Sequence, residues 1–126
     1  MNNITSPRTD DEAMERLIQA KGLTAPRITP TDIEANIASE HYFTAADGAY
    51  GAKPTDLHPP YAPLSRLTFC VLILRNGFTV TGESACASPE NFDVAIGRKI
   101  ARENAKQKVW PLMGYSLRNE LQARSF

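Results

Sequence analysis

The stretch that most constrains the fold is residues 67–84, LTFCVLILRNGFTVTGES. Two largely apolar runs, rich in β-branched and aromatic residues, flank Asn76-Gly77. An Asn-Gly pair between two such runs is a strong hairpin signal, because both residues adopt positive φ at low cost. We therefore predict antiparallel strands over about 67–74 and 78–84.

The turn also predicts which side chains share a face of the hairpin. A two-residue turn pairs Arg75 with Phe78 and sets Cys70 opposite Glu83 rather than Cys86, so we expect two free thiols. One face is fully apolar and is expected to pack on helices: Phe69, Val71, Ile73, Phe78, Val80 and Gly82. The other face is half apolar: Cys70, Leu72, Leu74, Thr79, Thr81 and Glu83.

A hairpin alone would leave two unpaired edges and a half-apolar face in water. Three kinds of cover are open: the N-terminal helices, a strand from the segment 44–66, or another copy of the chain. From this uncovered surface we infer a homo-oligomer.

The N-terminal half reads as helices followed by a loop. Residues 1–28 form a helical arm, with a helix from Thr9 to Gly22, and Thr29-Pro30 begins a second helix over 29–43. Residues 44–66 are rich in proline and lack periodicity, so we predict a loop or an insertion there.

The C-terminal half reads as a long helix after the hairpin. Ser88-Pro89 begins a helix over about 89–109, which Trp110-Pro111 ends, and a last helical segment reaches Leu121. We expect its buried sector to comprise Phe92, Ile96, Ile100, Ala101 and Ala105, and Gly97 to allow a close backbone approach. The predicted fold is a single α+β domain, with 67–121 as a hairpin–helix–helix core.

Composition excludes several classes of protein and shows an uneven charge. No apolar run approaches the ~20 residues of a membrane span, and the N-terminus lacks a signal-peptide core, so we expect a cytoplasmic protein. Residues 1–65 carry a net charge of −4 and residues 66–126 a net charge of +4. The two halves can pair within the chain or between subunits, which we favour, or the basic half can meet an acidic partner.

The side chains that could carry chemistry form no recognisable catalytic motif. Glu83 and Asp93 bracket a loop, and such a carboxylate pair could serve in acid–base chemistry or metal binding, but no third ligand follows at a fixed spacing. Ser84 or Cys86 could act as a nucleophile with His41 or His58 as base, yet no nucleophile signature surrounds them. We therefore favour structural roles for these residues, and expect no enzyme activity, cofactor or metal ion.

The predicted long helix is strongly basic. Arg98, Arg102 and Lys106 lie at i, i+4 spacing on what we expect to be its outer face, with Lys99 beside them. Such a ridge could bind an anionic small molecule or, less favoured, a nucleic acid, whereas a solvated or salt-bridged helix face is the simplest explanation. Asp93 and Asn104 project from the predicted buried sector and need hydrogen-bond partners, at a subunit interface or in a pocket.

Residues 67–121 resemble a family of small tailed-phage and prophage proteins, the gp-forty-nine/gp-sixty-six family. The resemblance rests on Asn76-Gly77-Phe78, on Thr81-Gly82-Glu83-Ser84, on Asn91-Phe92-Asp93 and Gly97-Arg98, and on Trp110-Pro111-Leu112 with Gly114-Tyr115. It extends more loosely to residues 29–42. The resemblance implies a phage origin and the host cytoplasm as the setting, but it supplies no catalytic or binding residue.

The expected function is therefore that of a small phage or prophage accessory protein that acts by binding a host factor, as in counter-defence or host takeover. The expected binding surface is the basic ridge with the adjoining loop 83–90. Two alternatives are open: an oligomer that sequesters an anionic, nucleotide-like ligand, and a nucleic-acid-binding protein.

Overall fold

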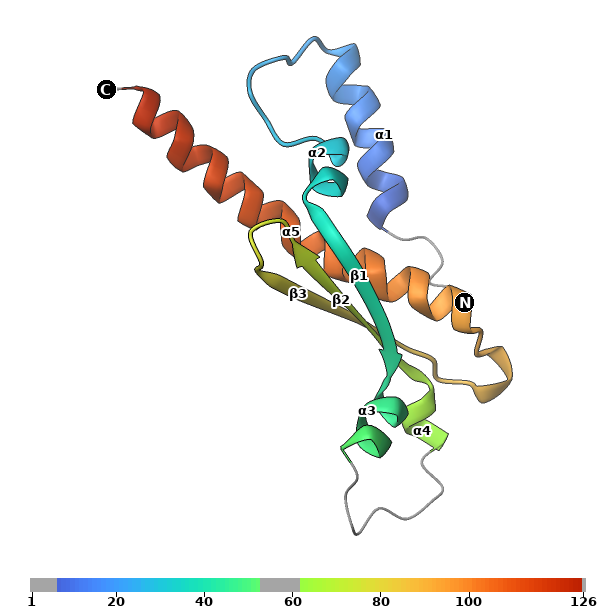
Figure 1. The fold of residues 1–126 in the computed structure, drawn as a ribbon. Coiled ribbons are helices and arrows are strands. Elements are labelled where there is room, and N and C mark those ends of the chain that lie inside the picture. Colours follow the sequence, from blue (N-terminus) through green and yellow to red (C-terminus); the bar gives the residue numbers. More distant parts are fainter. Residues whose placement is uncertain (1–6, 53–61, 126) are drawn as a thin grey trace.

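A computed structural model describes residues 7–52 and 62–125. The fold is α+β, with a three-stranded antiparallel sheet crossed by one long C-terminal helix (Figure 1). The elements in chain order are α1 (Pro7–Ala20), α2 (Pro30–Ala35), β1 (Ile37–Thr44), α3 (Ala45–Gly51), α4 (Ala62–Ser65), β2 (Leu67–Leu74), β3 (Thr79–Ala85), the 3-10 helix η1 (Pro89–Asn91) and α5 (Val94–Arg124).

The predicted hairpin is formed by β2 and β3, but its register is one residue away from the predicted one. The loop has three residues, 75–77: Leu74 N donates to Phe78 O at 2.8 Å, and Gly77 has a φ of 90°. This is the geometry of a turn closed by a glycine bulge, which Asn-Gly fits as well as a two-residue turn. Cys70 therefore lies opposite Gly82 rather than Glu83, and both cysteines are free thiols as expected.

A shift of one residue exchanges the faces of β3. Val80 and Gly82 lie on the same face as Cys70, Leu72 and Leu74, and this is the face that packs on α5. The prediction that the face with Phe69, Val71 and Ile73 packs on helices was wrong.

The predicted helix over 29–43 was correct only at its beginning. The Thr29 hydroxyl accepts a hydrogen bond from Asp32 N at 3.2 Å, and the Asp32 carboxylate accepts one from Thr29 N, which forms a capping box at the start of α2. The helix ends at Ala35, and β1 follows, pairing antiparallel with β2. Its β-branched and aromatic residues favour a strand, and β2 offers an open edge to it. A strand from 44–66 was one of the three kinds of cover left open; the strand that pairs with β2 lies almost wholly before that segment, at Ile37–Thr44.

Part of the predicted loop 44–66 is helical. Thr44 caps α3 through a second capping box with Asp47, and α4 leads into β2. Residues 53–61 of this predicted loop lie outside the described residues.

Helix α5 does not end at Trp110-Pro111; it continues through Pro111 to Arg124. A proline inside a helix removes one hydrogen bond and costs about 3 kcal/mol. Val109 and Trp110 before the proline and Met113 after it pack on the same core, which offsets that cost. The helix also begins later than predicted, at Val94, after η1.

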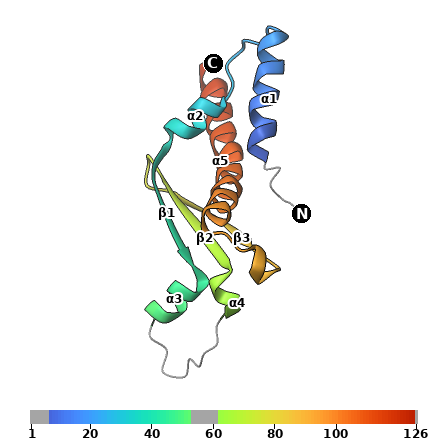
Figure 2. The same cartoon turned by 90° about the vertical axis from the view of Figure 1, so that its right-hand side faces the viewer.

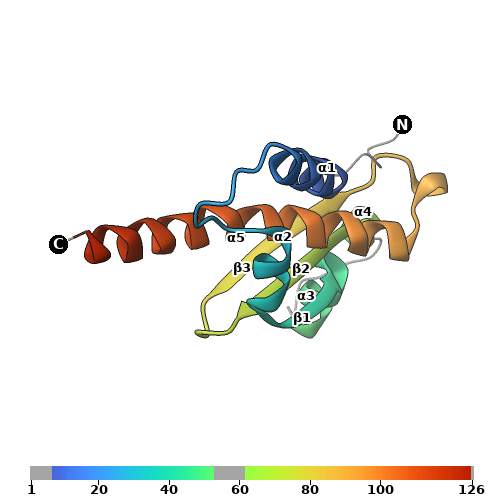
Figure 3. The same cartoon turned by 90° about the horizontal axis from the view of Figure 1, so that it is seen from above.

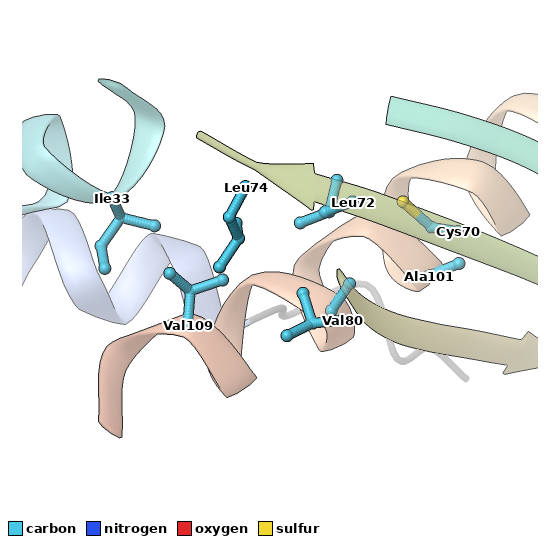
Figure 4. Close-up of a cluster of buried hydrophobic side chains, with 8 residues drawn as sticks. Ile33, Cys70, Leu72, Leu74, Val80, Ala101 and Val109 are labelled. Atoms are coloured by element: carbon cyan, nitrogen blue, oxygen red, sulfur yellow. The ribbon is translucent and has the colours of Figure 1, made fainter. Parts of the chain in front are cut away.

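The core lies between the sheet and a stripe of small residues on α5 (Figure 4). Ala101, Ala105 and Val109 are fully buried against Cys70, Leu72 and Val80, and Ile33 of α2 closes one end. The predicted burial of Ala101 and Ala105 is confirmed, whereas Ile96 is 47% exposed.

Glycines bring α5 unusually close to the sheet. A Cβ placed on Gly82 would lie less than 3.0 Å from backbone atoms of both Ala101 and Ala105. A Cβ on Gly97 would lie 3.0 Å from Thr68 Oγ1, which confirms the close approach predicted there.

The two faces of the sheet differ in their cover. Figure 2 shows α5 and α1 on one side of the sheet, and among the described residues no element crosses the middle of the other side. We call this other side the open face. Figure 3 shows that the C-terminal part of α5 projects beyond the sheet.

Candidate functional site

The predicted basic ridge is largely engaged in ion pairs with the acidic half of the chain. Arg102 donates to both oxygens of Glu34 and, through Nε, to Glu40 at 2.8 Å. Lys106 Nζ lies 2.8 Å from Glu34 and 3.8 Å from Glu103, which is 1% exposed. These contacts join α2, β1 and α5, so the pairing of the two charged halves within the chain occurs as favoured from the sequence. The side chain of Lys106 is 5% exposed and does not lie on an outer face.

The cluster shifts the ionisation of its members in the direction that stabilises the ion pairs. The Arg102 guanidinium holds the pKa of Glu34 at about 2 and lowers the pKa of Glu40. Burial, helped by a hydrogen bond from its hydroxyl to Glu40, raises the pKa of Tyr42. All of these shifts keep the carboxylates charged and the phenol neutral at neutral pH.

The first residue of the ridge has a different contact. The guanidinium of Arg98 lies 5.4 Å from the centre of the Tyr42 ring, as in a cation–π contact. Lys99 is exposed. Of the three ridge residues, Arg102 and Lys106 contact carboxylates and Arg98 covers an aromatic ring, so the ridge mainly links α5 to α2 and β1.

The other predicted site residues hold the backbone in place. Asp93 is the N-cap of α5, and its Oδ1 accepts a hydrogen bond from Ile96 N at 2.9 Å. Asn104 Nδ2 donates to the backbone carbonyl of Glu83 at 2.8 Å, which ties α5 to β3. Asp93 and Asn104 are exposed, so neither lies in a buried sector as predicted.

Cys86 and His41, candidates for a nucleophile and its base, each have a local partner. Cys86 Sγ donates to the Ser88 carbonyl at 3.1 Å, and the His41 ring lies 3.0 Å from Ser39 Oγ on the open face. His58 lies outside the described residues. Among the residues that the structure describes, no group of three or more His, Cys, Asp or Glu could hold a metal ion.

One open hollow on the surface of the described residues was not predicted from the sequence. A cleft of about 720 Å³, which we call the α5 cleft, lies between α2, the hairpin turn and the C-terminal part of α5. Its lining is mainly apolar: Ile28, Leu74, Phe78, Leu112, Met113 and Leu117. Phe78 is 56% and Leu112 41% exposed, and the charged residues Asp32, Arg75 and Glu120 lie in the walls.

Two signals in the sequence could have indicated this cleft. Met113 and Leu117 are spaced i, i+4 beyond the proline, which gives α5 an apolar stripe where it leaves the sheet. Phe78 follows directly after the turn, so its large ring had to lie near the tip of the hairpin. Neither signal shows that the tip and the stripe face each other.

Taken together, the fold and its surfaces define a small α+β protein with an apolar cleft and no recognisable catalytic centre among the described residues. The comparison of its sequence with known families places it further. Residues 28–121 match the Phage protein (N4 Gp49/phage Sf6 gene 66) family, and the chain belongs to that family. Neither the curated proteins nor the solved structures include one with a significant match to the chain. Across the described residues, no helix is long and apolar enough to span a membrane.

Proposed function

We propose that this phage-family protein is a non-enzymatic accessory protein that binds a host protein in the cytoplasm of the infected cell. The observation that carries the proposal is the α5 cleft, an apolar hollow at the point where α5 leaves the sheet. Clefts of about 300–1,000 Å³ with an apolar lining and a few polar groups are typical binding sites.

The partner that the α5 cleft fits best is an amphipathic helix of a host protein. Met113 and Leu117 present an i, i+4 stripe along one wall, and Phe78 and Leu74 form the facing wall. This is the arrangement in which an apolar helix face inserts into a groove. Asp32 and Glu120 in the walls would complement basic residues beside the apolar face of that helix, and Arg75 would complement an acidic one.

The two alternatives considered from the sequence need the basic ridge to meet phosphate groups. Two of its three charged side chains, Arg102 and Lys106, already contact Glu34. A phosphate would have to displace these contacts, so an anionic nucleotide or a nucleic acid has less to gain here than a protein has in the apolar cleft.

The test compares two lysine substitutions on the same projecting part of α5. Leu117→Lys places a charge in the cleft, whereas Asn119→Lys places the same charge on an exposed position outside its lining. Tagged wild-type and variant proteins are used to capture partners from host lysate. Each captured protein is then purified and titrated by calorimetry.

We expect one host protein to bind wild type and Asn119→Lys directly, and to bind Leu117→Lys about tenfold or more weakly. Circular dichroism should show the same fold in all three. Equal binding of the host protein to wild type and Leu117→Lys would refute the proposal. So would a captured partner that binds this protein only when a nucleic acid or a nucleotide is present.

A further inference from the structure

The turn of the hairpin places a reactive pair of residues at the edge of the α5 cleft. Asn76 lines the cleft, and both Asn76 and Gly77 are exposed. When glycine follows asparagine, the glycine nitrogen can attack the carbonyl carbon of the asparagine side chain, because no side chain on the glycine hinders the approach. The surroundings of Gly77 are equally open, since a Cβ built on it would meet nothing within 4 Å. The pair is therefore accessible to water and free of steric hindrance.

The turn also holds the two reacting groups in a defined arrangement. Asn76 Oδ1 accepts a hydrogen bond from Phe78 N at 2.9 Å, so the carboxamide lies over the backbone that follows it. Attack on the carboxamide carbon moves negative charge onto Oδ1, and the Phe78 amide already donates to that oxygen. Gly77 N donates to Leu74 O at 2.9 Å, and this bond must open before the nitrogen can attack. Because it lies at the exposed tip of the hairpin, we expect it to open readily.

We propose that Asn76 deamidates spontaneously in the folded protein and that the products change the charge and shape of the α5 cleft. Gly77 N gives up its proton to water and forms a bond to Asn76 Cγ. The bond from Cγ to the side-chain nitrogen then breaks, and this nitrogen takes up a proton and departs as ammonia, which leaves a five-membered succinimide ring. Water adds to one of the two ring carbonyls and breaks its bond to the ring nitrogen. The product is an aspartate, or an isoaspartate in which the main chain runs through the former side-chain carbon, and the reaction needs no oxidant or reductant.

Asn76 differs in this respect from the other asparagines that the structure describes. The sequence holds one Asn-Gly pair, and each of the other four described asparagines precedes a residue with a side chain: Asn36, Asn91, Asn104 and Asn119. Asn104 is in addition held by a hydrogen bond to the carbonyl of Glu83. Asn119 is exposed like Asn76, but it lies inside α5, where helical hydrogen bonds hold the nitrogen that follows it. Asn119 is therefore the matched control within the same chain.

The products change the α5 cleft in two ways. Either product puts a carboxylate into walls that already hold Asp32, Glu120 and Arg75, so the cleft becomes more acidic. Isoaspartate also adds one backbone carbon to a loop of three residues, whose size sets the pairing of Leu74 with Phe78. The ring of Phe78, which lines the cleft, must then move with the turn. The change concerns the cleft itself, so it does not depend on the host partner proposed above.

The first experiment ages the purified full chain at neutral and at mildly alkaline pH and follows each asparagine by peptide mass spectrometry. We expect Asn76 to deamidate at least about tenfold faster than Asn119, with both isomers formed. Its rate should rise about tenfold per pH unit, because the attacking nitrogen must lose its proton. Asn76→Gln, which would have to close a larger ring, should stay intact. Equal rates at Asn76 and Asn119 would overturn the proposal. So would an Asn76 that stays intact in the native chain but deamidates in the urea-unfolded chain, because the turn would then protect it.

The second experiment detects the change in the cleft. The isoaspartate form is separated by ion exchange, and the NMR signals of its methionine methyl groups are compared with those of fresh protein. Met113 lines the cleft, whereas Met14 is 55% exposed on α1 and lies outside the lining. The Met113 signal should shift and the Met14 signal should not, while aged Asn76→Gln protein should show neither change. A Met113 signal that is unchanged in fully converted protein would overturn the effect on the cleft.

Discussion

At the scale of single residues, the closest packing in the molecule depends on a glycine of β3. Gly82 lies directly under the backbone of α5, and the stripe Gly97, Ala101 and Ala105 on the helix is small enough to accept it. Larger side chains on the same helix, such as Ile96, are displaced to the exposed flank. The face that α5 directs toward the sheet is therefore set by the repeat of its small residues, and not by the repeat of its large apolar residues.

This packing predicts the effect of a single methyl group. Gly82→Ala would force its Cβ into backbone atoms on α5, which cannot rotate away as a side chain can. We expect a loss of about 3 kcal/mol or more in the free energy of unfolding, measured by urea denaturation. The control is Gly114→Ala in α5, where the added Cβ meets nothing within 4 Å and a gain of about 1 kcal/mol is expected from helix propensity. Equal effects of the two substitutions would contradict the close approach.

At the scale of elements, the hydrophobic pattern predicted whether a segment is a helix or a strand better than it predicted the residues at which each element begins and ends. The Asn76-Gly77 signal correctly located the hairpin, but it fits two turn geometries, and only packing selects the one with Gly77 as a bulge. Ile33 and Ile37 fit helical spacing, yet the second begins β1 because β2 offers it hydrogen bonds. Helix α5 continues through Pro111 because residues on both sides of the proline pack on the core, and this packing offsets the cost of the proline.

The candidate site, too, could be predicted from the sequence only in part. The sequence indicated that the basic and acidic halves could pair, and it identified Arg102 and Lys106 among the charged residues that matter. It could not show that Glu34 is their common partner, because the residues are far apart in the chain, 68 positions for Glu34 and Arg102, and only the fold brings them together. The α5 cleft, formed by segments from three parts of the chain, was missed for the same reason.

The ion pairs between α2 and α5 predict a dependence of stability on pH. The pKa of Glu34 falls from its ordinary 4.5 to about 2 on folding, so its contribution is fully present above pH 4.5 and is lost as the pH falls towards 2. Glu34→Gln should lower the free energy of unfolding at pH 7 by about 1 kcal/mol, a small value because the carboxylate is partly exposed and screened. Glu15 pairs with Arg27 outside this cluster and titrates in both proteins, so its effect cancels in the difference.

The measurement is urea denaturation of both proteins from pH 7 to pH 2. The difference between them should stay constant down to about pH 4.5 and shrink below it. Glu120→Gln, which removes an exposed pair with Arg124 on α5, is the control and should have little effect at any pH. A difference that grows towards low pH would show that Glu34 does not act through its charge.

At the scale of the whole molecule, α1 is attached differently from the other elements. Met14 and Leu17 on α1 are 55% and 48% exposed, so it buries little apolar surface. Its links are mostly polar. Glu15 pairs with Arg27 in the segment that follows α1, and Asp11 accepts hydrogen bonds from Gln107 and Trp110 of α5. Because burial of apolar surface is the main source of stability, an element held in this way should open before the core does.

We therefore expect hydrogen exchange to divide the chain into two units. The amides of α1 should exchange through local opening at a low free energy, whereas those of β2 and the middle of α5 should exchange only through global unfolding. Asp11→Ala removes the acceptor of both hydrogen bonds from α5, and it should speed exchange in α1 about tenfold, which corresponds to about 1.4 kcal/mol, without changing exchange in β2. Trp110, the single tryptophan, should show a red-shifted emission in the same variant. Glu12→Ala removes the same charge from an exposed neighbouring position and should change neither signal. Exchange of α1 and β2 amides at one common rate would show instead that α1 belongs to the cooperative core, and that its polar links hold it as firmly as burial holds α5.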